Sequence, residues 1–98
     1  MTITKTKENN VLTLSLLGRL DSSTAVELDD ALKAEVTPEL TALVLDMEGV
    51  DFISSRGLRV ILFYNKELNG RSLRILHCNS AVMEIFRLSG LEKHLCFE

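Results

Sequence analysis

The alternation of apolar and polar positions along the chain predicts its strands. Residues 3–8 alternate and are rich in β-branched side chains, Asn9-Asn10 supplies turn chemistry, and a more apolar stretch follows at residues 11–17. We therefore expect the chain to open with an antiparallel hairpin. Residues 43–45 form a short, continuously apolar run, which is typical of a strand buried on both faces, and residues 73–76 repeat this pattern apart from Arg74. We expect the first of these two strands to be central in the sheet.

A first helix is predicted over residues 23–35, where apolar residues recur at helical spacing. Thr24-x-x-Glu27 has the form of a capping box at its start, and Pro38 ends the helix. The acidic residues of this helix are Glu27, Asp29, Asp30 and Glu35. Such a run is usually a solvated face, but it can also orient a charged partner.

The same periodicity predicts two further helices, at residues 56–69 and 80–89, followed by Gly70 and Gly90 where C-terminal caps are expected. A last short strand is predicted at residues 95–97. The resulting order is ββαβαβαβ. Strands that alternate with helices imply right-handed crossovers, so we expect an α/β fold with a mostly parallel sheet, about three helices and the hairpin as its antiparallel edge.

Length and composition restrict the class of protein. With 98 residues, 46% apolar and 26% charged, the chain is expected to form one globular domain over residues 1–98. The longest uninterrupted apolar run is the five residues 60–64, far below the roughly 20 that cross a bilayer, so we expect no membrane insertion. Cys78 and Cys96 form no CxxC pair, and no secretory leader is recognised before them. We expect reduced thiols and a cytoplasmic location.

Charge is distributed unevenly between the halves of the chain. The formal net charge is −3, from four Lys/Arg against nine Asp/Glu in residues 1–50 and seven against five in residues 51–98. The overall negative charge argues against direct binding of nucleic acid. The second half is locally basic.

The segment 50–58, which we expect to join the central strand to the second helix, carries two hydroxyls at the helix start, Ser54 and Ser55. A serine there is most often an N-cap, but two exceed what one cap needs. Arg56 and Arg59 add cations within one turn, so this place favours a phosphate, either covalent on serine or from a ligand. We expect the Ser55 hydroxyl to be accessible.

A second stripe runs along the same helix, opposite its main apolar face, through Arg56, Val60, Phe63 and Glu67. Its apolar centre either packs under another helix or forms an exposed docking surface with an aromatic anchor. Periodicity leaves both alternatives open.

Catalytic and metal-binding motifs are not recognisable in the chain. P-loop, GxGxxG, GxSxG and HExxH patterns are absent, and Asp46, Glu48 and Asp51 have no recognisable catalytic spacing. A metal site would require His77-Cys78 to meet His94 and Cys96 without any known ligand spacing. We expect no catalytic residue, no metal site and no cofactor, and hence no enzyme.

Three motifs in order resemble the STAS domain over nearly the whole chain. They are Gly18-Arg19-Leu20-Asp21 with Thr24-Ala25, then Phe52-Ile53-Ser54-Ser55-Arg56-Gly57-Leu58, then Leu88-Ser89-Gly90-Leu91. The resemblance is closest to the free-standing bacterial anti-sigma factor antagonists. In that family the second motif usually has aspartate where this chain has Ser54, and a second serine where it has Arg56.

The resemblance implies partner switching. The unphosphorylated antagonist binds an anti-sigma factor that is also a serine kinase, frees a sigma factor, and is released by phosphorylation until a phosphatase acts. By position the phosphorylated residue is Ser55, with Ser54 as second choice. The expected partner-binding residues are Asp21, Ser54, Ser55, Arg56, Gly57, Arg59, Val60 and Phe63.

Two other functions remain open at this point. STAS-like chains also serve as constitutive interaction subunits of membrane transport assemblies, without phosphorylation. A phosphocarrier or small enzyme would use Ser55 or Cys78 as nucleophile, with His77 or His94 as base.

Overall fold

The computed structural model covers residues 1–98 and contains a five-stranded mixed sheet with three α-helices. The elements are β1 (Thr2–Glu8), β2 (Val11–Leu20), α1 (Thr24–Glu35), β3 (Ala42–Ile53), α2 (Ser55–Glu67), β4 (Ser72–Leu76), α3 (Ser80–Leu88), the short 3-10 helix η1 (Glu92–His94) and β5 (Cys96–Phe97). Strands follow the order β1-β2-β3-β4-β5, with β1 antiparallel to β2 and the other pairs parallel. The predicted element order, the antiparallel edge and the central position of the third strand are confirmed.

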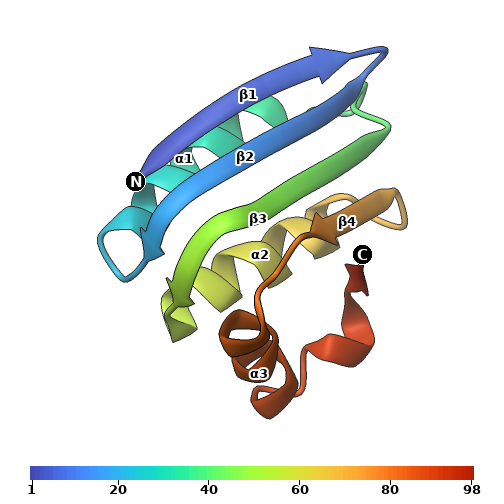
Figure 1. The fold of residues 1–98 in the computed structure, drawn as a ribbon. Helices are drawn as coiled ribbons and strands as arrows, with labels where there is room; N and C mark the ends of the chain where they lie inside the picture. Colours follow the sequence, from blue (N-terminus) through green and yellow to red (C-terminus); the bar gives the residue numbers. More distant parts are fainter.

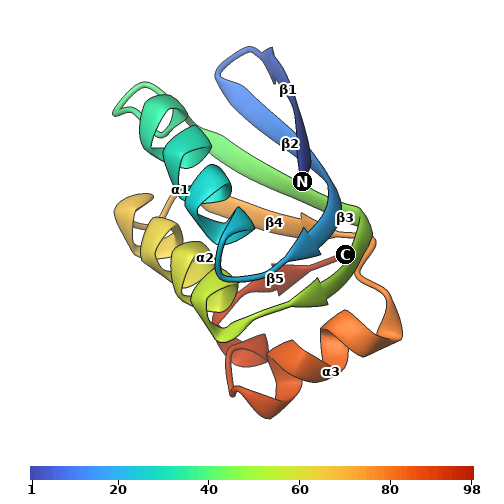
Figure 2. The ribbon, with the colours of Figure 1, turned by 90° about the vertical axis from the view of Figure 1, so that its left-hand side faces the viewer.

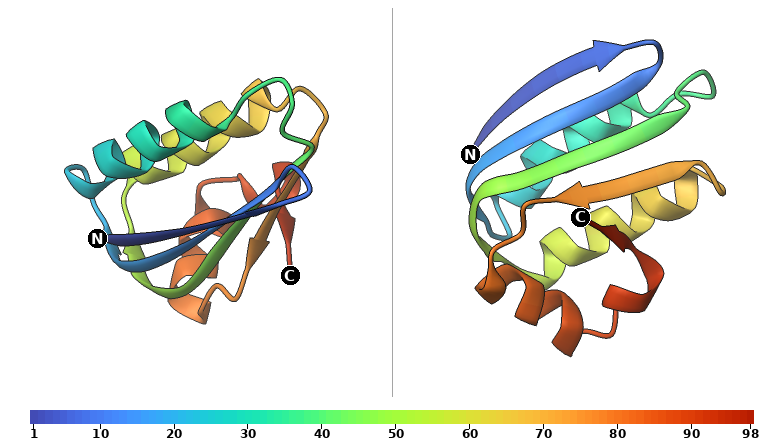
Figure 3. Two further views of the ribbon diagram at one scale, coloured as in Figure 1. Left: turned by 90° about the horizontal axis from the view of Figure 1, so that it is seen from above. Right: turned by 45° about the vertical axis from the view of Figure 1, so that its right-hand side comes forward.

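Helices α1 and α2 lie side by side on one face of the sheet, and α3 lies beyond the carboxyl end of β4 (Figures 1 and 2). Alternate strand residues such as Leu14, Leu45 and Ile75 are completely buried beneath the two helices and form the core. No helix covers the opposite face of β1, β2 and β3 (Figure 3). The sheet therefore has one packed face and one open face.

The opening hairpin turns at two asparagines. Asn9 and Asn10 have φ angles of 50° and 64°, which are the two left-handed positions of a type I′ turn. Asparagine tolerates this conformation better than other residues with a side chain, and the turn sets the register in which Glu8 pairs with Val11.

The predicted capping box at Thr24 and Glu27 is wrong. Asp21 Oδ1 accepts hydrogen bonds from the backbone N–H groups of Ser23 and Thr24, both at 3.0 Å, while Thr24 Oγ1 accepts one from the Asp21 N–H at 2.9 Å. These bonds form a capping box between Asp21 and Thr24, three residues earlier than the predicted one. Asp21 caps the helix because its short carboxylate lies directly beside the unpaired N–H groups at the helix start.

The third strand is longer than predicted. Residues 50–53, expected in a joining loop, belong to β3 and pair with β2 up to Leu20 opposite Ile53. The pairing register shifts twice along this ladder, which interrupts the alternation that marks a strand. Gly49 lies at one shift, where an added Cβ would be 2.9 Å from the Leu16 carbonyl oxygen. Helix α2 consequently starts directly after the strand, with only Ser54 between them.

The longest helix, α2, has 13 residues, and none of the helices has the length and apolar character of a membrane-spanning segment.

Candidate functional site

The ends of β2 and β3 bring the first two sequence motifs together. Leu20 and Ile53 are paired residues, and the Ser54 N–H donates a hydrogen bond of 2.8 Å to the Leu20 carbonyl. The loop that starts at Asp21 and the start of α2 therefore lie side by side at the carboxyl ends of parallel strands. Function in open α/β sheets concentrates at this edge.

The two serines at the start of α2 have different roles. Ser54 is the N-cap: its backbone is extended, and its Oγ accepts a hydrogen bond of 3.1 Å from the Gly57 N–H. Ser55 is the first residue of the helix and is exposed, as expected. The N-cap requirement is thus met by Ser54, and the exposed Ser55 lies at the positive end of the helix dipole.

Asp21 and Gly57, both expected to contact a partner, have roles within the fold. Asp21 is half-buried, and hydrogen bonds, first from the Thr24 backbone and then from the side chains of Ser23 and Thr24, lower the pKa of its carboxyl to about 2. Gly57 is buried, and a Cβ there would lie 2.8 Å from Leu20 Cγ. Its missing side chain lets α2 approach β2 closely.

The remaining predicted residues line an open groove between α1 and α2. Arg56, Arg59, Val60 and Phe63 border this groove together with Asp29 of α1, and its volume is about 380 Å³. The Phe63 side chain is 53% exposed, whereas Val60 is half-buried and packs against the core. The sequence left open whether this stripe is a docking surface or a packed face. Phe63 is exposed, as a docking residue would be, whereas Val60 is partly packed against the core. We call this surface the α1–α2 groove.

A hydrogen bond that the sequence did not predict joins α1 to α2 beside the groove. The Tyr64 hydroxyl donates to Asp29 Oδ1 at 2.7 Å, across the two helices. Burial, followed by this contact with the Asp29 carboxylate, raises the pKa of Tyr64 well above its usual value. The Phe63 ring packs edge-on against the Tyr64 ring, with centroids 5.0 Å apart. The sequence carried one signal for this bond. Tyr64 lies on the buried side of a predicted helix, and a buried tyrosine hydroxyl needs a hydrogen-bond partner.

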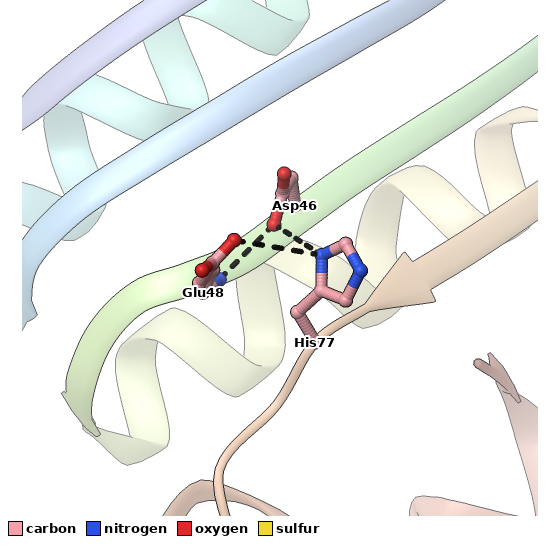
Figure 4. A network of polar contacts seen from close by, with 3 residues as sticks. All are labelled: Asp46, Glu48 and His77. Carbon is pink, nitrogen blue, oxygen red and sulfur yellow. Dashed lines mark hydrogen bonds and ion pairs between the residues drawn. The ribbon is translucent and has the colours of Figure 1, made fainter.

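Two further residues, Cys78 and His77, were candidates for a nucleophile and its base. Cys78 is partly buried, and burial raises the pKa of its thiol to about 11, so it is protonated at neutral pH and is a poor nucleophile. His77 lies instead beside Asp46 and Glu48 (Figure 4). Sequence reasoning missed this cluster, although Asp46 and Glu48 are two residues apart on a strand and hence share a face.

Comparison with known proteins agrees with the motifs and the fold. A family model described as "Mlab, STAS domain" matches residues 3–96. Anti-sigma-F factor antagonist RsfB of Mycobacterium tuberculosis is 32% identical over 95 residues, which are 95% of this chain and 77% of that protein. BtrV of Bordetella bronchiseptica, named as a candidate anti-sigma factor antagonist, is 35% identical over 92 residues, which are 92% of this chain and 79% of that protein.

A solved structure shows the same fold. The crystal structure of an anti-sigma factor antagonist from Mycobacterium paratuberculosis superimposes with a TM-score of 0.89 at 27% identity, over 98% of this chain and 83% of that chain. A family model that spans nearly the whole chain, together with relatives above 30% identity, is sufficient to assign the family. The chain belongs to the STAS domain family.

Proposed function

We propose that this protein is an anti-sigma factor antagonist that works by partner switching. In the unphosphorylated form it binds an anti-sigma factor that is also a serine kinase, through the α1–α2 groove and the start of α2. Phosphorylation of Ser55 releases it, and a phosphatase restores the binding form. The names of the similar proteins support the class of function, and the exposed Ser55 beside the groove supports the mechanism.

The placement of Ser55 carries the proposal. A phosphate there adds about −1.5 to −2 charges at pH 7. Within the free protein the helix dipole and the nearby Arg56 and Arg59 stabilise that charge, so phosphorylation leaves the fold intact. In the complex the phosphate enters a surface that fits a neutral hydroxyl, where desolvation and repulsion act against binding.

Incubation with the candidate kinase and ATP, followed by intact mass, tests the modification. We expect one phosphate on the wild-type chain and on Ser54→Ala, and none on Ser55→Ala. Ser54→Ala removes an N-cap and costs about 1 kcal/mol, so circular dichroism must first show that it is folded. Phosphate retained on Ser55→Ala and lost on Ser54→Ala would move the switch to Ser54.

Calorimetry with the anti-sigma partner tests the switch itself. Ser55→Asp is expected to weaken binding and Ser55→Ala to retain it, because only aspartate introduces charge. Ser80→Asp is the matched control, since Ser80 is likewise an exposed first residue of a helix, α3. Equal affinities for the two Ser55 variants would contradict the switch. They would also favour a constitutive interaction subunit of a transport assembly, whose binding does not depend on phosphorylation.

The α1–α2 groove makes separate predictions for charge and for apolar contact. Arg56→Ala and Arg59→Ala are expected to weaken the unphosphorylated complex in a salt-dependent way. Phe63→Ala is expected to cost more, with little salt dependence, as an apolar anchor does. Leu88→Ala, which removes a side chain 74% exposed on α3, is the control that leaves affinity unchanged. Unchanged affinity for all the groove variants would place the interface elsewhere.

A further inference from the structure

Asp46, Glu48 and His77 meet on the open face of the sheet. Asp46 and Glu48 are alternate residues of β3, and His77 directly follows β4, whose Leu76 is paired with Asp46. The three side chains lie on the face turned away from α2 (Figure 4). The cluster shares no residue with the α1–α2 groove.

The three side chains are close enough to share one ion. A ligand atom from each lies within 4.8 Å of the others, with His77 Nδ1 3.0 Å from Asp46 Oδ1 and 4.0 Å from Glu48 Oε2. Asp46 Oδ1 accepts a hydrogen bond of 3.1 Å from the Glu48 N–H, and the His77 N–H donates one of 3.1 Å to the Glu98 carbonyl. These bonds hold Asp46 and the His77 backbone in place. The Glu48 side chain is 79% exposed and is free to adjust.

One imidazole nitrogen with two carboxylate oxygens is a mixed donor set, and it suits transition-metal cations such as Zn²⁺. Zinc bonds to nitrogen and oxygen of about 2.0–2.2 Å place neighbouring tetrahedral ligands roughly 3.4 Å apart. The observed separations of 3.0 and 4.0 Å lie on either side of that value, and a bound ion would replace the hydrogen bond between His77 Nδ1 and Asp46 Oδ1. Mg²⁺ and Ca²⁺ prefer oxygen ligands throughout, which disfavours them at a site with an imidazole.

The cluster also leaves room for water. Asp46 and Glu48, but not His77, border a shallow hollow of about 320 Å³ that is also lined by Thr2, Thr4 and Ser15. We propose that Asp46, Glu48 and His77 form a binding site for one divalent transition-metal cation of the Zn²⁺ class, with water completing its coordination. The two carboxylates balance the charge of the ion.

Calorimetric titration of ZnCl₂ into the full chain tests the site. We expect one ion per chain, with Asp46→Asn and His77→Gln each weakening the affinity at least about tenfold. His94→Gln and Cys96→Ser are matched controls, because both residues are exposed metal-ligand types outside the cluster, and both variants should bind as the wild type does. Thermal melts establish that each variant is folded.

Imidazole resonances give an independent readout, since Zn²⁺ should shift those of His77 and leave those of His94 unchanged. Three results would overturn the proposal: the absence of Zn²⁺ binding at millimolar concentration, equal weakening by His94→Gln or Cys96→Ser, or equally tight binding of MgCl₂. Each of these leaves the proposed partner switch untouched, because that switch depends on other residues.

Discussion

Gly57→Ala tests whether the start of α2 depends on a missing side chain. Gly57 lies in the first turn of α2 and has an ordinary helical conformation, so helix propensity alone favours alanine there by about 1 kcal/mol. Packing acts in the opposite direction. The added Cβ would lie 2.8 Å from Leu20 Cγ and 3.1 Å from Ile53 Cγ1, against an optimal carbon–carbon separation of about 3.5–4.0 Å. Leu20 and Ile53 are almost completely buried, and side chains in a close-packed core have little space in which to move.

The balance of these effects gives the expected magnitude. Overpacking of a close-packed core costs about 1–3 kcal/mol. When the gain in helix propensity of about 1 kcal/mol is subtracted from this packing cost, Gly57→Ala should lower the free energy of unfolding by about 1 kcal/mol. In a domain of this size that corresponds to a fall in Tm of roughly 4–8 °C.

Urea unfolding followed by circular dichroism measures the effect, and a double-mutant cycle identifies its cause. Leu20→Ala alone should cost about 2–5 kcal/mol, because it opens a cavity. In the Gly57→Ala background it should cost less, because the new methyl group occupies part of that cavity. Stabilisation by Gly57→Ala, or strict additivity of the two substitutions, would refute close packing as the reason for glycine at this position.

Three further predictions concern polar contacts within the fold. Tyr64→Phe removes the hydrogen bond to Asp29 and should cost about 1–2 kcal/mol in urea unfolding; no loss would mean that the bond is offset by hydration. The carboxyl of Asp21 should titrate near pH 2 in the folded protein by NMR, so its stabilising contribution is present above its unfolded pKa near 3.9 and is lost as pH falls through about 2; a midpoint near 4 would contradict the cap. Arg71 donates to the carbonyls of Thr37 and Leu40, at 2.7 and 2.6 Å, so Arg71→Met should lower the unfolding midpoint, and an unchanged midpoint would show that water replaces the guanidinium fully.

Much of the fold could be predicted because its signals are local. The Asn9-Asn10 turn requires two left-handed residues in succession, and asparagine tolerates them. The apolar residues 43–45 are all buried, as expected, whereas the strand at residues 72–76 is buried on one face only, at Leu73 and Ile75, with Arg74 exposed between them. The start of α2 was expected within one residue, because its motif combines serines with a following helical period.

The contacts that shape the site depend on distant parts of the chain and could not be predicted. Tyr64 and Asp29 are 35 residues apart, and His77 and Asp46 are 31 apart. Whether such pairs meet depends on the rotation of each helix about its axis and on strand register, neither of which the spacing of residues defines. The end of β3 could not be predicted either, because the register shifts between β2 and β3 depend on both strands together.

The two departures from the usual family motif have different structural consequences. Ser54 occupies the N-cap position, where serine and aspartate are about equally effective, so the helix start is preserved while one negative charge beside Ser55 is absent. Arg56 is exposed and adds a positive charge at the same place. Both changes make the surroundings of Ser55 more favourable to a phosphate. Under the proposed function, the free phosphorylated protein is therefore not strained, and the free energy that drives release must arise at the partner's surface.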